Sequence, residues 1–151
     1  HTHPRPADLD NAIKRTLQEH GAELIVPAGY MKPIGPKLLA AYKPRIVNIH
    51  PSLLPKYGGK SMYGQSVHEA VLASGDKITG ITVHLVDSEY DRGHIITQSK
   101  VEVLQNDTVS TLSARVLKRE HSLLVDTIQR IISGETDLQS IADGKQAKLY
   151  I

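Results

Sequence analysis

Short β-branched runs alternate along this chain with stretches of helical periodicity, and Gly or Pro separates most of them. Between residues 8 and 20, Leu9, Ile13 and Leu17 recur every four residues, which is the spacing of an amphipathic helix. We expect helices at 8–20, 36–42, 65–74 and 108–133, and strands at 22–26, 45–50, 78–86 and 95–103. This alternation predicts an α/β layered fold with a largely parallel sheet.

The last two expected strands are an exception to the parallel pattern. Only the acidic loop 87–93 joins them, which is too short for a crossover, so they should pair antiparallel. The core should be aliphatic, because the chain has no Phe or Trp. The segment after Gly134 is polar and weakly patterned, so no regular element is expected there.

Composition excludes several classes of function. Net charge is +2 and the basic residues are scattered, so no nucleic-acid partner is expected. The absence of Cys excludes disulfides and thiolate chemistry and favours a reducing cytoplasm. No apolar run approaches the ~20 residues of a membrane span, and no signal peptide is visible, so no membrane partner is expected either.

Asn48 and His50 lie two apart on the expected strand 45–50, so their side chains should share a face. They sit at its C-terminal end, where open α/β sheets place their ligand sites, and Pro51 ends the strand. An amide donor can stabilise an oxyanion and an imidazole can move a proton, which suits acyl transfer. The alternative is a loop-capping Asn beside a structural His, because such pairs are common near strand ends.

The loop 87–93 holds three carboxylates, at Asp87, Glu89 and Asp91. Calcium binding is disfavoured, because Arg92 and Gln98 stand where an EF-hand loop needs Gly and Glu. A carboxylate directed at His50 would raise the pKa of the imidazole, whereas the alternative is a solvated acidic turn.

Three further polar features leave alternatives open. His84 lies mid-strand among apolar residues and is expected to be a hydrogen-bonded core histidine; no spacing of His residues predicts zinc. Glu120 falls on the apolar side of the last helix, where it either curls to solvent or accepts hydrogen bonds from a ligand. The stretch 106–108 is expected to cap that helix.

The run 48–57, Asn-Ile-His-Pro-Ser-Leu-Leu-Pro-Lys-Tyr, resembles the signature of the phosphoribosylglycinamide formyltransferases, folate-dependent enzymes of purine synthesis. The stretches 28–32, 79–86, 91–93 and 119–121 resemble other segments of that family in order and spacing. The resemblance implies the C-terminal part of a Rossmann-like, mostly parallel sheet with one antiparallel strand pair near its C-terminal end. It also implies 10-formyltetrahydrofolate as co-substrate, glycinamide ribonucleotide as substrate, and no metal.

By that resemblance, Asn48, His50 and Asp91 form the catalytic trio. Asn48 would stabilise the oxyanion, and His50, held by Asp91 directly or through water, would assist proton transfer. His68 matches a histidine in a mobile loop near the site. The folate contacts implied are Met31, Lys32, Pro33, Ile34, His84, Leu85, Val86 and Asp87, and the substrate contacts are Glu120 for the ribose and Arg5 for the phosphate.

Residues 1–151 are expected to be a single formyltransferase domain that lacks the family's N-terminal third, with its phosphate-binding loop. Such a chain should keep the trio and most of the folate site but bind the phosphorylated substrate poorly. The loop 58–66 looks longer than in the best-known members, so no contacts are transferred there.

The runner-up functions are methionyl-tRNA formyltransferase, formyltetrahydrofolate deformylase, and an inactive folate-binding or interaction module. The residues at 50–59 favour the glycinamide ribonucleotide enzyme over the first two. A homodimer stays open, because the sequence does not fix the oligomeric state.

Overall fold

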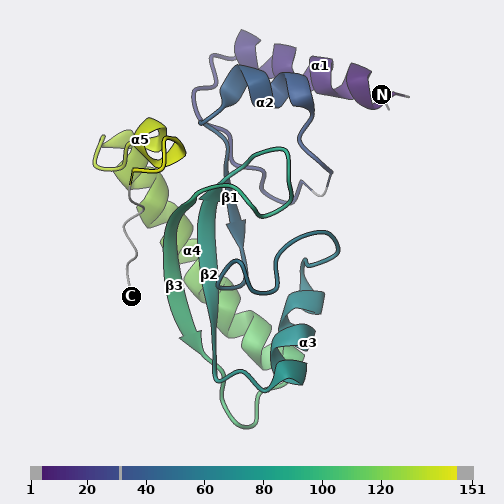
Figure 1. Cartoon of the computed structure of the whole chain (residues 1–151), viewed down its shortest axis with the longest axis vertical. Coiled ribbons are helices and arrows are strands. Elements are labelled where there is room, and N and C mark those ends of the chain that lie inside the picture. Colours follow the sequence, from purple (N-terminus) through teal and green to yellow (C-terminus); the bar gives the residue numbers. More distant parts are fainter. Residues whose placement is uncertain (1–4, 31, 146–151) are drawn as a thin grey trace.

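The computed structural model describes residues 5–30 and 32–145 (Figure 1). Its elements in chain order are α1 (Pro6–Glu19), α2 (Pro36–Tyr42), β1 (Val47–His50), α3 (Gln65–Ser74), β2 (Ile78–Leu85), β3 (Ile95–Glu102), α4 (Val109–Ile132) and α5 (Leu138–Ala142). The mixed α/β class expected from the sequence is confirmed. Across these described residues, no helix is long and apolar enough to cross a membrane.

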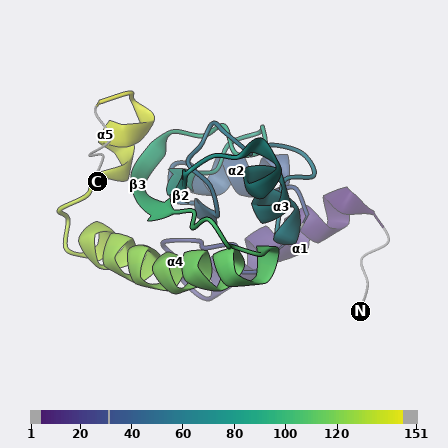
Figure 2. The same ribbon diagram turned by 90° about the horizontal axis from the view of Figure 1, so that it is seen from below.

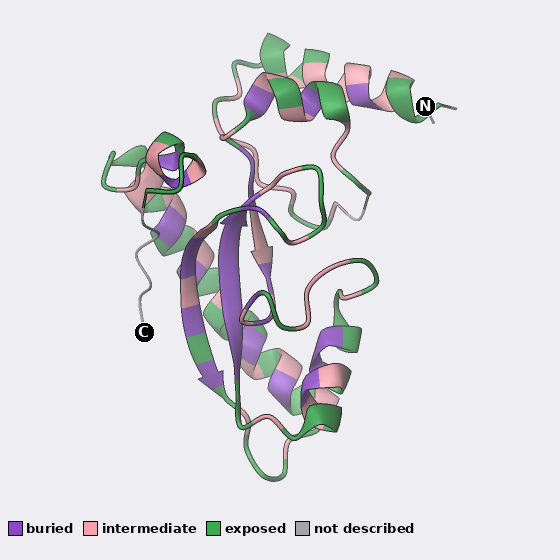
Figure 3. Cartoon of the chain, viewed as in Figure 1, coloured by how far each residue is buried: buried purple, intermediate pink, exposed green. Residues whose placement is uncertain are grey.

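The sheet of the described region has the strand order β1-β2-β3, with both pairings antiparallel. The predicted antiparallel pairing of the last two strands is therefore confirmed, with Ile78 opposite Glu102. The central strand β2 is buried along nearly its whole length (Figure 3). Helix α4 runs along one face of the sheet (Figure 2), where Leu112 and Val116 pack with Ile81 and Val83 in an aliphatic core.

The prediction of a strand at 22–26 is wrong, because the structure has no continuous strand there. Ile25 forms one isolated parallel bridge with Ile46, in which Ile25 donates to the carbonyl of Arg45 and Val47 donates to that of Ile25. A run of residues becomes a strand only when its backbone groups find partners, and in the described region this run has a partner at one point only. Within the described residues, the parallel pairing expected for the sheet is limited to this bridge, and the three-stranded sheet itself is antiparallel rather than largely parallel.

The long helix α4 begins and ends as expected. Thr108 caps it, because its hydroxyl accepts from Thr111 N at 3.2 Å while Thr111 Oγ1 accepts from Thr108 N at 2.9 Å. Gly134 follows the helix with φ 78°, a left-handed conformation that glycine adopts without steric cost. No regular element was expected after Gly134, but the structure has helix α5 there. Asp137 caps this helix, and Leu138 and Ile141 are its buried residues.

Asp10 joins the two N-terminal helices. This buried carboxylate of α1 accepts from Lys37 N at 2.9 Å and from Leu38 N at 3.1 Å, so it caps α2 from a neighbouring helix. Gly35 precedes α2, and a Cβ atom there would lie 2.1 Å from Asp10 Cγ. The capping contact therefore requires both a carboxylate at 10 and a glycine at 35.

Replacing Asp10 by Ala should lower the free energy of unfolding by about 2 kcal/mol, because two donors at the start of α2 lose their acceptor. Urea denaturation measures this change. The control is Glu19→Ala on the same helix, whose exposed carboxylate lies 3.7 Å from Arg15 and should contribute less than about 0.5 kcal/mol. Equal losses in the two variants would contradict the capping role.

Candidate active site

Asn48 and His50 share one face of the sheet, as predicted from their spacing. In the antiparallel register, Asn48 lies opposite His84 and His50 lies opposite Thr82. Residues opposite each other in a ladder point to the same side, so these four side chains gather on one face. Helix α4 covers the other face, where Ile81 and Val83 point.

The turn after β1 is fastened to this face by Thr82, whose hydroxyl is fully buried. Thr82 Oγ1 donates to the carbonyl of Ser52 at 2.7 Å and accepts from Leu54 N at 3.0 Å. Gln98 Nε2 donates to the carbonyl of Leu54 at 3.0 Å and to Thr82 Oγ1 at 2.8 Å. The segment 51–55 is therefore bound to β2 and β3, which fixes the direction in which the chain leaves His50.

Asp91 lies between two histidines. Its Oδ2 is 3.5 Å from His50 Nδ1, and its Oδ1 is 3.5 Å from His84 Nε2. The carboxylate also accepts from Gly59 N at 2.9 Å, which ties the acidic loop to the loop after β1. The structure thus brings the predicted trio together and places His84 beside it. In the text below, Asn48, His50, His84 and Asp91 are called the catalytic-face network, after the role predicted for the trio.

Burial dominates the electrostatics of His50, which is 4% exposed. Loss of solvation lowers the pKa of its imidazole, although Asp91 and the hydrogen bond to the carbonyl of Tyr57 oppose that shift. The expectation that a carboxylate would raise this pKa is confirmed for the contribution of Asp91, although burial outweighs that contribution and the net pKa is lowered. For Asp91, burial raises the pKa, but the adjacent His84 ring and the hydrogen bond from Gly59 N outweigh it and lower the pKa overall.

His84 has a defined tautomer, because its Nδ1 donates to the carbonyl of Leu85 at 2.8 Å. In the neutral ring Nε2 is then an acceptor, and Asn48 Nδ2 lies 3.3 Å from it. This hydrogen bond orients the Asn48 side-chain amide and uses one of its two N–H groups, which leaves the second N–H for another acceptor. The predicted core histidine is confirmed as hydrogen-bonded and buried. Its predicted contact with folate stays a prediction.

The other predicted site residues fall in three places. Ile34 and Val86 pack on the same small apolar cluster, with Leu38, Tyr42 and Ile46, which brings the two expected folate segments together. Lys32 and Pro33 are exposed, Leu85 is buried and Asp87 is half-buried, while Met31 lies outside the described residues. Arg5 directly precedes α1, and its guanidinium pairs with Asp8 at 2.8 Å.

Two further titratable groups lie outside the network, one on α3 and one on α4. His68 of α3 is 4% exposed, and burial together with the charge of His50 lowers its pKa. Glu120 of α4 is half-buried, and burial raises the pKa of its carboxyl to about 7. Curling of Glu120 fully into solvent, which the sequence left open, is therefore not what the structure shows.

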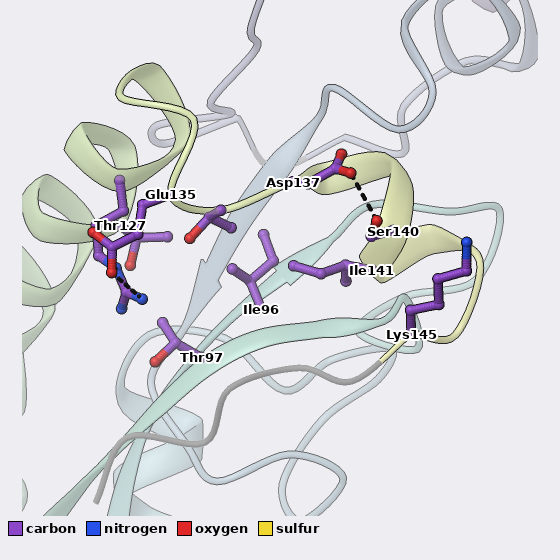
Figure 4. A pocket seen from close by; sticks show the side chains of 10 residues that line it. Ile96, Thr97, Thr127, Glu135, Asp137, Ser140, Ile141 and Lys145 are labelled. Atoms are coloured by element: carbon purple, nitrogen blue, oxygen red, sulfur yellow. Dashed lines mark hydrogen bonds and ion pairs between the residues drawn. The ribbon is translucent and has the colours of Figure 1, made fainter.

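A small cavity of about 110 Å³ lies between β3, the end of α4 and α5 (Figure 4). Its walls include Ile96 and Thr97 of β3, Thr127 of α4 and Ile141 of α5. Thr97 is opposite Val83 in the sheet, so the cavity is on the α4 side, across the sheet from the catalytic-face network. It is therefore separate from that network.

Metal binding has no support in the described part of the chain, where no three or more His, Cys, Asp or Glu side chains form a candidate metal group. The network pairs imidazoles with a carboxylate and an amide instead. The expectation that no metal takes part stays a prediction.

An α/β domain that holds an amide, an imidazole and a carboxylate together on a buried sheet face has the groups needed for acyl transfer. The profile of the formyl transferase family matches residues 2–128, and the chain belongs to that family. The resemblance to phosphoribosylglycinamide formyltransferases is confirmed by its relatives. The chain is 48% identical over 115 residues to the chloroplastic enzyme of that name from Arabidopsis thaliana, and 42% identical over 126 residues to the one from Bacillus subtilis.

Those alignments cover 76% and 83% of this chain, but only 39% and 62% of the two relatives. The crystal structure of glycinamide ribonucleotide transformylase 1 from Symbiobacterium toebii matches with a TM-score of 0.80 at 38% identity. That match covers 87% of this chain and 60% of the other. The chain thus spans about two fifths to three fifths of the length of these relatives.

Proposed function

We propose that this chain carries the catalytic face of an enzyme that transfers the formyl group of 10-formyltetrahydrofolate to the amine of glycinamide ribonucleotide in purine synthesis. The observation that supports this most is the buried catalytic-face network, in which Asp91 lies 3.5 Å from both His50 and His84. The names of the relatives supply the substrate, and the network supplies groups that suit its chemistry.

The chemistry follows from the positions of the polar atoms. The substrate amine attacks the formyl carbon, and the carbonyl π electrons move to oxygen, where the free N–H of Asn48 would stabilise the oxyanion. The nitrogen loses a proton as the new C–N bond forms, and His50 would accept it while Asp91 balances the imidazolium charge. Collapse of the intermediate then breaks the bond between the formyl carbon and N10 of the folate, which takes up a proton as it leaves.

The donor set suits a folate. Ile34 and Val86 would supply apolar contacts from one cluster, and Asp87, half-buried in the loop after β2, would supply polar ones. Glu120 would accept hydrogen bonds from ribose hydroxyls and Arg5 would pair with the phosphate. A cytoplasmic location and the absence of nucleic-acid and membrane partners agree with the composition and belong to the same proposal.

Replacement of Asn48 by Ala should lower kcat about a hundredfold, because the oxyanion loses its side-chain donor. The rate of formyl transfer in the presence of both substrates measures this. KM for the folate should change little, since Asn48 acts on the transition state. Retention of full turnover in this variant would overturn the assignment, and release of formate without an amine acceptor would favour the deformylase chemistry.

A further inference from the structure

His50 is held from a second side by the loop that follows β1. Its Nε2 donates to the carbonyl of Tyr57 at 2.7 Å, so the ring lies between that carbonyl and the Asp91 carboxylate. Tyr57 has φ 54°, which a non-glycine residue adopts at a cost and keeps only when its surroundings hold it. The position of this carbonyl therefore depends on what fixes the Tyr57 side chain.

The turn between α3 and β2 fixes that side chain. The hydroxyl of Tyr57 donates to Asp76 Oδ2 at 2.8 Å and lies 2.6 Å from Ser74 Oγ. Lys56 Nζ donates to the same Asp76 oxygen at 2.9 Å. A continuous series of contacts thus runs from the half-buried Asp76 near the surface, through Tyr57, to the buried ring of His50.

We propose that Tyr57 and Asp76 are positioning residues for His50, which together hold the Tyr57 carbonyl against Nε2 and so favour the protonated imidazole during formyl transfer. The catalytic importance of His50 rests on the proposed function. The contacts by which Tyr57 and Asp76 hold the Tyr57 carbonyl against the ring are observed independently of that function.

The contacts favour the protonated ring of His50 because it faces two acceptors, the Tyr57 carbonyl and the Asp91 carboxylate. With both ring nitrogens protonated, Nε2 donates to the Tyr57 carbonyl and Nδ1 faces Asp91, so both contacts suit the imidazolium. A neutral ring can satisfy only one of them as a donor. The other titratable groups near His50 are His84 on β2 and His68 on α3, and both would oppose a second positive charge. Loosening the Tyr57 carbonyl therefore destabilises the imidazolium that forms when the neutral ring accepts the substrate proton.

The test is an NMR titration of the His50 ring in the unmodified chain and in Tyr57→Phe and Asp76→Asn. The midpoint for His50 should fall by about half a pH unit in each, since part of a hydrogen bond to a charged group is lost. The combined variant should fall no further, because both changes break the same series of contacts. Tyr63→Phe is the matched control, since it removes the same atom from an exposed side chain of the same loop.

Turnover supplies the second readout. In Tyr57→Phe, kcat should fall about two- to fivefold with KM unchanged, as expected when a base weakens without loss of binding. A His50 midpoint that is the same in Tyr57→Phe as in Tyr63→Phe would overturn the proposal. The titration needs no turnover, so an inactive but folded unmodified chain would count against the proposed function and leave the positioning result readable.

Discussion

Replacement of Asp91 by Asn is expected to lower turnover about a thousandfold while the chain stays folded. Among residues 5–30 and 32–145, this carboxylate is the one that contacts both His50 and His84, each at 3.5 Å. Without it, a proton taken up by His50 would leave a buried cation with no counter-charge, which is costly in a site of low polarity. Steady-state formyl transfer at saturating folate measures the loss, and the NMR midpoint of His50 should fall at the same time.

Asn is the suitable replacement because of the backbone at this position. Asp91 has φ 55°, a left-handed conformation that Asn tolerates well among non-glycine residues. The Asn oxygen can still accept from Gly59 N, which now bonds the carboxylate at 2.9 Å. A loss of activity in this variant therefore reports the charge rather than the loop.

Glu89→Gln is the matched control. Glu89 lies in the same loop, is exposed, and pairs with Arg92 at 3.3 Å, so its loss should leave turnover unchanged. Comparable turnover in Asp91→Asn and Glu89→Gln would show that the network does not act in catalysis. A large drop in thermal stability of Asp91→Asn would point instead to a structural role.

The part of the site that the sequence predicted depends on local geometry. The side chains of Asn48 and His50 share a face because a strand has a period of two, whatever its neighbours are. Helix α3 has its predicted bounds because a glycine flanks it on each side, and Gly75 takes a left-handed φ of 73° at its end. These features needed no knowledge of tertiary contacts.

The features of the site that could not be predicted from the sequence depend on strand pairing and on burial. His84 joins the network because the antiparallel register sets it opposite Asn48, and nothing in the spacing of residues 48 and 84 fixes that register. The raising effect of a carboxylate on the pKa of His50 was predictable because Asp91 is visible in the sequence, whereas the larger lowering effect of burial was not. Signals for α5 were present in Asp137, Leu138 and Ile141, but two apolar residues are too few to establish a period.

The buried side of helix α4 could also not be predicted fully from the sequence. The expected buried side was Leu112, Val116, Leu124, Ile128 and Ile131. The structure buries Leu112, Val116, Leu123 and Thr127, and Leu124 and Ile128 are only half-buried. Apolar residues occupy both 123 and 124, so the sequence leaves the rotation of the helix free by one residue, and packing against the sheet decides it.

Glu120 makes this chain's stability depend on pH. Its carboxylate is half-buried on α4, and the described part of the chain gives it no hydrogen-bond or ion-pair partner. Burial raises its pKa from 4.5 to about 7. Between those two values the unfolded chain has released this proton and the folded chain still holds it, so the unfolded state binds fewer protons and the free energy of unfolding falls as pH rises.

Replacement of Glu120 by Gln should remove that dependence. Near pH 8 the variant should unfold with a free energy about 2 kcal/mol higher than the unmodified chain, less than the full shift implies because the side chain is partly solvated. Near pH 4 the two should be equally stable, since both side chains are then neutral. Urea denaturation at the two pH values measures the difference, with Glu69→Gln on the exposed face of α3 as the control.

The same variant separates stability from binding. If the carboxylate accepts hydrogen bonds from ribose hydroxyls, Glu120→Gln should raise KM for glycinamide ribonucleotide while it stabilises the fold near pH 8, because an unpartnered buried charge is costly until a ligand arrives. A gain in stability that is the same near pH 4 and pH 8 would contradict the raised pKa. A gain in stability confined to high pH, with KM unchanged, would support the raised pKa of the Glu120 carboxyl. It would also show that Glu120 does not bind the substrate.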